Sequence, residues 1–262
     1  MTDFSNQNFD LTGKVAIVTG AGGRGNSIGR AYAVALSNAG ASVVVADLNG
    51  EGAERVSNEI TGQGGKAISV QVDIVDPASV QAMVASATEA FGGVDILVNN
   101  AALMLEMGAS ATISTNKSDF DKFMAVNVWG AMNCTQAVTP SMTERGGGAI
   151  VNQLSAGAFP AQSLYGITKL ALAGTTTTLA AELGGQKIRV NAIAPGMTQT
   201  DAGLAMTPDD SPFVQAVMNR CVIQPRDTPD ALCGALLLLV SDAGRWMTGQ
   251  ILNVDGGWIQ RY

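Results

Sequence analysis

The sequence predicts an α/β fold in which helices cover both faces of one parallel sheet. Short apolar runs rich in β-branched residues, typical of buried strands, alternate along the chain with longer helical patterns. Strands joined in this way by helices lie parallel to one another. The 262 residues are 47% hydrophobic and include 31 glycines, which suits a continuous sheet core with frequent turns. We find no internal repeat and no linker, so residues 1–262 are predicted to form a single domain.

About seven strands are expected, each a short apolar run bounded by turn residues. In order they are residues 15–18, 42–46, 67–72, 94–98, 149–153, 187–193 and 251–254. The helices expected between them are residues 30–36, 77–91, 117–144, 163–183 and 228–241. Asp76 and Pro77 mark one helix start, because aspartate caps a first turn and proline fits the first helical position.

A glycine-rich turn, TGAGGRGNSIG at residues 19–29, joins the first strand to the first helix. In this context glycines let backbone N–H groups approach a pyrophosphate, and the helix N-terminus adds a favourable dipole. The second strand ends in Asp47, 27 residues after Gly20. A carboxylate there can accept hydrogen bonds from an adenosine ribose and would repel a 2′-phosphate; the alternative is a turn or helix-cap aspartate. The sheet is therefore predicted to be Rossmann-like and doubly wound, and to bind NAD rather than NADP.

Tyr165 and Lys169 stand four residues apart in the segment LYGITK, so a helix would place the phenol and the ammonium one turn apart on one face. A phenol ionises near pH ~10, and a nearby cation lowers that pKa toward a useful range. Such a tyrosine can take a proton from an alcohol or return one to a carbonyl. Ser155 lies ten residues upstream. The pair alone is common by chance, and an exposed helical Tyr/Lys pair is the alternative interpretation.

Over nearly its whole length the chain resembles the short-chain dehydrogenase/reductase family. Several landmarks appear in the family's order: Thr19-Gly20, Asp73, Asn99-Asn100-Ala101-Ala102, Asn127, Ser155, Tyr165, Lys169, Pro195-Gly196 with Thr198, Gly249-Gln250 and Asp255-Gly256-Gly257. The residues expected from this resemblance to contact the cofactor are Gly20, Gly22, Ser27, Ile28, Asp47, Leu48, Asp73, Ile74, Asn99, Ala101, Tyr165, Lys169, Pro195, Gly196 and Thr198.

The resemblance implies reversible hydride transfer between NAD and a secondary alcohol/ketone pair. In it Tyr165 is the general acid/base, and Lys169 lowers its pKa and bonds the nicotinamide ribose. Ser155 donates a hydrogen bond to the substrate oxygen, where negative charge develops. Asn127 kinks its helix and holds a water that links Lys169 to solvent; satisfying a helix break is its simpler role.

Three features depart from the family's usual pattern. The glycine loop is about three residues longer, with residues 23–27 carrying the excess, and resembles the loop ending in Ser-Ile-Gly of the enoyl-reductase branch. Which N–H groups would hold the phosphates therefore stays open. The fourth strand ends in Asn-Asn-Ala-Ala instead of Asn-Asn-Ala-Gly. The interval from Ser155 to Tyr165 is about three residues short, and Ser163 is too close to Tyr165 to replace Ser155.

The segment 197–225 interrupts the alternation of strands and helices, and in the family it is the mobile lid over the substrate. A surface helix with an ordinary buried face is the alternative. Apolar residues that could form the pocket are Leu204, Met206, Phe213, Val217 and Met218 in this segment, with Leu103, Met104, Leu105, Met107 and Phe159 elsewhere. With adaptable methionines and no obvious arginine clamp, the expected substrate is a neutral hydrophobic alcohol or ketone, cyclic or aromatic.

Composition and charge exclude several other classes. The net charge of −7, without clusters of Lys or Arg, argues against nucleic acid as a partner. No apolar run approaches the ~18 residues that cross a bilayer, and the first eight residues lack the parts of a secretory signal. Without histidine a Ser-His-Asp hydrolase is excluded and a zinc alcohol dehydrogenase is disfavoured. Cys134, Cys221 and Cys233 lack metal spacing, so we expect reduced thiols, no metal and a cytoplasmic location.

Charged residues make up only 14% of the chain, so part of the surface is expected to be buried in a homotetramer, or else in a dimer. Two alternatives to an NAD-dependent alcohol/ketone oxidoreductase stay open. One is an NADP-dependent 3-oxoacyl thioester reductase, in which Arg24 would meet the 2′-phosphate against the opposition of Asp47. The other is a non-catalytic NAD-binding scaffold, which need not keep Ser155, Tyr165 and Lys169.

Overall fold

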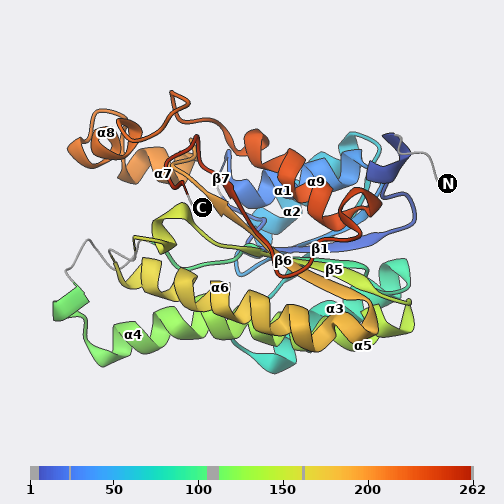
Figure 1. The fold of residues 1–262 in the computed structure, drawn as a ribbon. Helices are drawn as coiled ribbons and strands as arrows, with labels where there is room; N and C mark the ends of the chain where they lie inside the picture. The colour runs from blue at the N-terminus through green and yellow to red at the C-terminus, as the bar shows by residue number, and fades with distance from the viewer. Residues whose placement is uncertain (1–5, 24, 105–111, 161–162, 261–262) are drawn as a thin grey trace.

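The computed structural model describes residues 6–23, 25–104, 112–160 and 163–260. Within them seven strands form one sheet in the order β3-β2-β1-β4-β5-β6-β7, and every pairing is parallel (Figure 1). The strands are β1 Val15–Thr19, β2 Ser42–Asp47, β3 Lys66–Gln71, β4 Ile96–Asn99, β5 Gly148–Gln153, β6 Ile188–Pro195 and β7 Ile251–Val254. The predicted doubly wound parallel sheet is confirmed.

Helices cover both faces of this sheet (Figure 1). One face carries α1 Ile28–Asn38, α2 Gly50–Gly62 and α9 Cys233–Val240, and the other carries α3 Pro77–Phe91, α5 Gly130–Glu144 and α6 Leu164–Leu183. Side chains alternate between the two cores along a strand: Ala16 and Val18 pack toward α1, whereas Ile17 packs toward α3. Because both faces are buried, the central strands read as continuous apolar runs.

The order of the strands reverses between β1 and β4, since the chain runs outward from β1 through β2 and β3 and then returns to the other side of β1. At such a switch point the loops beyond the carboxyl ends of the two strands diverge and leave a crevice, which is where open α/β sheets bind ligands. Thr19 and Asn99 end these two strands, and Gln153 and Pro195 end the next two on the same edge. The topology therefore brings the predicted site residues to one edge.

Helix α2 was not predicted from the sequence. Three glycines among its thirteen residues weaken the helical pattern, since glycine is a poor helix former. Asn49 caps the helix by accepting a hydrogen bond from the Gly52 N–H at 3.2 Å, and Val56 and Ile60 bury its inner face. A Cβ at Gly52 would overlap the carbonyl oxygen of Gly22, so glycine here lets α2 approach the glycine-rich loop.

The long helix expected at 117–144 is interrupted. It begins as α4 Lys117–Met124, passes through one π-helical turn at Ala125–Trp129 and continues as α5. The 197–225 segment holds two short helices, α7 Asp201–Met206 and α8 Pro212–Met218. The helix expected at 228–241 starts as a 3₁₀ turn at Pro229–Leu232 before α9. In the described ranges no helix combines the length and the apolar composition of a membrane span.

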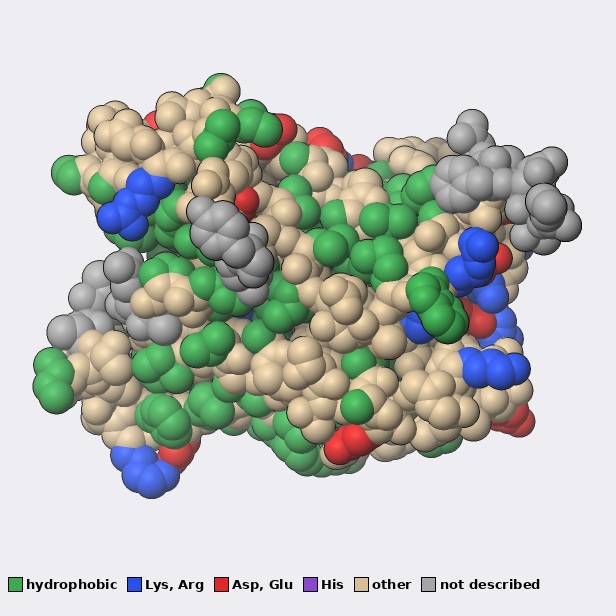
Figure 2. All heavy atoms as spheres, in the orientation of Figure 1, with side chains coloured by type: hydrophobic (Ala, Val, Ile, Leu, Met, Phe, Trp, Pro, Cys, Tyr) green, Lys and Arg blue, Asp and Glu red, His purple; other side chains and the backbone are tan. Residues whose placement is uncertain are grey.

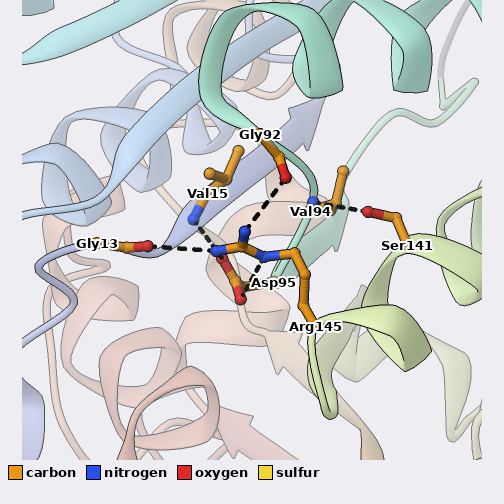
Figure 3. A network of polar contacts seen from close by, with 7 residues as sticks. All are labelled: Gly13, Val15, Gly92, Val94, Asp95, Ser141 and Arg145. Atoms are coloured by element: carbon orange, nitrogen blue, oxygen red, sulfur yellow. Dashed lines mark hydrogen bonds and ion pairs between the residues drawn. The ribbon is translucent and has the colours of Figure 1, made fainter.

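An ion pair ties elements together at the amino edge of the sheet (Figure 3). Arg145, just after α5, forms two hydrogen bonds to the carboxylate of Asp95, with Nε–Oδ1 at 3.0 Å and Nη2–Oδ2 at 2.8 Å. Arg145 also donates to the carbonyls of Gly92 and Gly13, while Asp95 accepts from the N–H of Val15. These contacts join the starts of β1 and β4 to the end of α5.

Candidate active site

The ends of β1 and β4 are fastened together beside the crevice. The side-chain amide of Asn100 donates to the carbonyls of Thr19 and Gly20 at 3.0 and 2.9 Å. In return the Thr19 hydroxyl accepts from the N–H groups of Asn100 and Ala101, both at 3.2 Å. Gly20 has a φ of +66°, and a Cβ on it would lie 2.6 Å from the Ala101 Cα. Glycine is therefore required at position 20 by both its conformation and the closeness of the second loop.

Asp47 lies where a ribose-binding carboxylate is expected, at the end of β2 beside the glycine loop. Its Oδ2 accepts from the N–H of Gly22 at 2.8 Å and its Oδ1 from the N–H of Asn49 at 2.9 Å. An ionised carboxylate can accept about four hydrogen bonds, so capacity remains for a ribose diol. Leu48 is 68% exposed beside it and presents no positive charge. The residues at this position fit an adenosine ribose without a 2′-phosphate.

The N-terminus of α1 opens onto the same crevice. Ser27 caps the helix by accepting from the Arg30 N–H at 3.3 Å, so the N–H groups of Ile28 and Gly29 lie in the first turn, where no helical carbonyl accepts them. Free donors and the helix dipole favour a diphosphate here. Contact of Ser27 and Ile28 with the phosphates stays a prediction, and Arg24 lies outside the described residues.

Asp73 and Ile74, predicted to contact the cofactor, follow β3 in the loop that leads to α3. The Asp73 carboxylate accepts from the N–H of Val75 at 2.9 Å, which turns the chain toward α3. Ile74 is buried, and a Cβ on Gly130 would lie 2.5 Å from its Cδ1. Asn133 of α5 donates to the Ile74 carbonyl at 2.9 Å. These contacts hold the loop after β3 against α5.

Asn99 is used inside the protein core. Its amide nitrogen donates to the Ala131 carbonyl, the Thr135 hydroxyl and Asn152 Oδ1, at 3.2, 3.3 and 2.9 Å. Its Oδ1 has no hydrogen-bond partner among the described residues. The side chain is therefore directed toward α5 and β5, so a cofactor contact through its amide is not supported.

The nicotinamide end of the crevice is expected at the end of β6. Gly196 donates its N–H to the Val254 carbonyl at 3.0 Å, and a Cβ on it would lie 2.7 Å from the Asp255 Cα. The Thr198 hydroxyl donates to the Gly196 carbonyl at 3.3 Å. Pro195 and Gly196 are thus fixed against β7 and the C-terminal turn.

Lys169 is buried, with 1% of its surface exposed, and its Nζ donates to the Gln153 carbonyl at 2.7 Å. Loss of hydration lowers the pKa of the Lys169 ammonium to about 7. Its Nζ lies 5.6 Å from the centroid of the Tyr165 ring, so α6 does place both groups on one face. The ammonium is therefore close to the phenol while remaining bonded to β5.

Burial raises the pKa of the Tyr165 phenol, and a hydrogen bond with the Ser155 side chain opposes this shift. The sequence predicts instead that Lys169 lowers this pKa. In the structure burial is the largest cause, because it disfavours the charged form of the phenol, and the Ser155 hydrogen bond offsets it only in part. Tyr165 thus holds its proton at neutral pH, whereas Lys169 titrates close to it.

Asn127 occupies the π-helical turn and is 1% exposed. Its Oδ1 accepts from the Leu103 N–H at 2.7 Å, and its Nδ2 donates to the Leu103 carbonyl at 2.9 Å and to the Thr168 hydroxyl at 3.0 Å. The predicted interruption of its helix is confirmed. Asn127 connects the loop after β4 to the residue that precedes Lys169.

Two contributors to this site were not found from the sequence. Gln153, whose carbonyl holds Lys169, accepts a hydrogen bond from the buried Tyr32 hydroxyl at 2.9 Å through its side chain. The indole of Trp258 lies beside Gly157: a Cβ there would be 3.8 Å from Trp258 Cη2 and 3.4 Å from Ser155 Oγ. Those two atoms are therefore at most about 7 Å apart. Three carboxylate hydrogen bonds of Asp255 fix this C-terminal turn.

The candidate pocket residues are only partly brought together. Met104, Leu204, Met206 and Phe213 are exposed, Val217 is buried, and Phe159 packs on the cluster around Leu154. Leu105 and Met107 lie outside the described residues. Among the described side chains, no group of three or more Cys, Asp or Glu lies close enough to hold a metal ion.

Comparison with known proteins agrees with this geometry. Residues 23–259 match the family model described as Enoyl-(Acyl carrier protein) reductase. An uncharacterized oxidoreductase of Mycobacterium tuberculosis is 52% identical over 248 residues, covering 95% of this chain and 98% of the relative. The 7alpha-hydroxysteroid dehydrogenase of Escherichia coli is 36% identical over 261 residues, 98% of each chain. A solved 7 alpha-hydroxysteroid dehydrogenase, complexed with NADH and 7-oxo glycochenodeoxycholic acid, superposes with a TM-score of 0.88 over 99% of each chain at 35% identity.

Proposed function

The chain belongs to the short-chain dehydrogenase/reductase family and is thus an oxidoreductase of alcohols and carbonyl compounds, and we propose that it interconverts a hydrophobic secondary alcohol and its ketone with NAD(H). The observation that carries this proposal is the cluster of Ser155, Tyr165 and Lys169 at the carboxyl edge of the sheet. A scaffold that only bound NAD would have no use for a buried lysine beside a buried phenol.

When bound, NAD supplies the nicotinamide that accepts or donates the hydride. The chain's own residues would manage the proton. In ketone reduction Tyr165, protonated at neutral pH, donates its proton to the substrate oxygen, and Ser155 stabilises the negative charge that develops there. In alcohol oxidation the Tyr165 phenolate, which the ammonium of Lys169 stabilises, takes the proton of the alcohol. Asn127 keeps Lys169 in place through Thr168.

We propose NAD as the cofactor because the free acceptor positions of Asp47 suit a ribose diol, and because the related hydroxysteroid dehydrogenase structure contains NADH. A 2′-phosphate would meet the carboxylate with no compensating cation at Leu48. The test is kcat/KM measured with each cofactor. Asp47→Ala should narrow the preference for NAD, and equal or better turnover of the wild type with NADP would contradict the proposal.

The proposed substrate is neutral, hydrophobic and cyclic or aromatic. The indole of Trp258 near Ser155 offers an apolar wall, and the exposed Leu204, Met206 and Phe213 lie on the segment proposed as a lid, residues 197–225. The related structure contains 7-oxo glycochenodeoxycholic acid, a steroid ring system that also carries a carboxylic acid, so it supports a cyclic hydrophobic substrate and gives no support for neutrality. Screening cyclic, aromatic and acyl-thioester substrates with both cofactors tests it. Preferred turnover of a 3-oxoacyl thioester with NADP would favour the alternative reductase.

The proposed assembly is a homotetramer. Figure 2 shows hydrophobic side chains gathered over α4 and α6, and Phe120 and Leu170 are among the exposed apolar residues there. Exposed apolar surface on helices is suited to pairing with a second copy. Light scattering at micromolar concentration tests this, and a monomeric mass would contradict it. The cytoplasmic location remains a prediction.

A further inference from the structure

The lengthened part of the glycine loop contacts the segment proposed as the lid. The N–H of Asn26 donates to Asp201 Oδ2 at 3.0 Å, and the N–H of Asp201 donates to the Asn26 carbonyl at 3.1 Å. The side-chain amide of Asn26 adds a longer bond of 3.4 Å to the Gln199 carbonyl. Two segments about 175 residues apart in the chain are thus joined through both main-chain polar groups of Asn26.

Gly25 is shaped to this contact. Its φ is +55°, and a Cβ on it would overlap the carboxylate of Asp201. Asp201 is the first residue of α7, and that helix is capped by Thr200, whose hydroxyl accepts from the Gly203 N–H at 2.9 Å. The carboxylate of Asp201 is therefore not needed as the cap and is free to hold the loop.

We propose that Asp201 is a positioning residue for the dinucleotide loop. It fixes Gly25 and Asn26, and thereby the two residues that follow, Ser27 and Ile28, at the start of α1. A glycine-rich excess of this kind has high conformational entropy when free, and ordering it on cofactor binding would reduce affinity. Asp201 orders it in advance. This inference rests on the proposed dinucleotide site, and it assigns a role to the extra loop residues that the catalytic scheme does not use.

The carboxylate has two opposing effects on a bound diphosphate. Its hydrogen bond orders the loop, whereas its negative charge repels the phosphates. Asparagine retains an acceptor oxygen and loses the charge, and alanine loses both. Comparing Asp201→Asn with Asp201→Ala therefore separates positioning from charge. Asp210→Ala is the matched control, because Asp210 is an exposed aspartate of the same segment beyond α7.

The experiment measures the Kd of NADH by fluorescence titration and that of ADP-ribose by calorimetry for each variant. Asp201→Ala should raise both values by about tenfold, since an ordering contribution of ~1.4 kcal/mol changes an equilibrium tenfold. In Asp201→Asn both Kd values should stay within about threefold of the wild-type values. Asp210→Ala should have the wild-type Kd values. In steady-state kinetics the loss in Asp201→Ala should appear as a raised KM for NADH.

A double-mutant cycle adds a second measurement. Gly25→Ala should weaken NADH binding strongly in the wild type, where the new Cβ displaces Asp201, and less in the Asp201→Ala background. Equal effects in both backgrounds would show that the two residues are not coupled and would overturn the inference.

Three binding results would also overturn it. The first is that both Kd values, for NADH and for ADP-ribose, stay within twofold of wild type in Asp201→Ala. The second is that Asp201→Ala binds ADP-ribose normally but no longer binds NADH, which would place the effect in closure over the nicotinamide. The third is that Asp201→Asn binds NADH and ADP-ribose more tightly than wild type, which would make charge repulsion the dominant effect. Failure of the wild type to bind NADH would instead contradict the proposed function.

Discussion

A cation lies at each of the two edges of the sheet, partly exposed at the amino edge and buried at the carboxyl edge, and its surroundings differ. At the amino edge Arg145 is paired with Asp95 through two hydrogen bonds, and these bonds raise the pKa of the guanidinium (Figure 3). At the carboxyl edge Lys169 is buried, and its hydrogen-bond partner among the described residues is one neutral carbonyl, that of Gln153. The paired charge stays ionised and stabilises the fold, whereas loss of hydration brings the pKa of the unpaired one to about 7. A buried cation without a charged partner therefore marks the edge at which the chemistry is proposed.

Removing the phenol should produce the largest effect on the reactive edge. Tyr165→Phe should lower kcat by about 10³-fold, because the proton donor is lost, and should leave the Kd of NADH close to normal. Lys169→Ala should reduce both turnover and NADH affinity. Steady-state kinetics with fluorescence titration distinguishes the two variants. Substantial activity in Tyr165→Phe would mean that another group is the acid/base.

Breaking the amino edge should affect stability and spare the chemistry. Arg145→Ala leaves the buried Asp95 carboxylate without its cation and should lower the free energy of unfolding by about 2–3 kcal/mol. This loss is smaller than for a fully buried pair, because 28% of the Arg145 side chain is exposed. Lys117→Ala, in the exposed pair with Asp121, is the control and should cause no measurable change. Chemical denaturation and kcat of the folded fraction measure both effects. A large loss of kcat in Arg145→Ala would remove the contrast between the edges.

The pH dependence of stability should also differ between the edges. The folded-state pKa of Lys169, about 7, lies below its unfolded value near ~10.4, so between these pH values the unfolded state binds more protons. Lys169 therefore makes the folded state more stable as pH rises through this window. Lys169→Met should flatten the rise in the free energy of unfolding from pH 7 to about pH 10. Identical pH profiles would show that Lys169 is normally hydrated.

The smallest expected effect concerns the substrate. Phe213→Ala or Met206→Ala should raise KM for bulky neutral substrates by a few fold and leave NAD affinity unchanged, because both residues lie on the segment proposed as a lid. Hydrogen exchange should show 197–218 as the fastest-exchanging internal segment of the ligand-free protein and slower once cofactor and substrate bind. Rigid behaviour together with an unchanged substrate profile would direct attention to Leu103, Phe159 and Trp258.

Some features could be predicted because they leave a local pattern in the sequence. They are the strands, most crossover helices, and the placement of Tyr165 and Lys169 on one face of a helix. Apolar runs report buried strands, and a four-residue interval reports one helix face. Contacts between distant segments leave no such pattern, so Asp95 with Arg145, Asn26 with Asp201 and Gly157 with Trp258 were missed. Helix α2 was missed for a different reason, since its glycines serve a close approach to the loop at Gly22 and weaken the helical pattern.

The clamp of Asn127 on Leu103 has a consequence for how the enzyme can diversify. One side-chain amide satisfies both main-chain polar groups of Leu103, much as a neighbouring strand would. The chain is thereby anchored before it leaves toward α4, and α4 starts again at its own cap, Asn116. The same amide also holds Thr168, so the position of Lys169 depends on contacts that end at Leu103. Substrate preference could then change through the chain beyond Leu103 without loss of the residues proposed to transfer the proton.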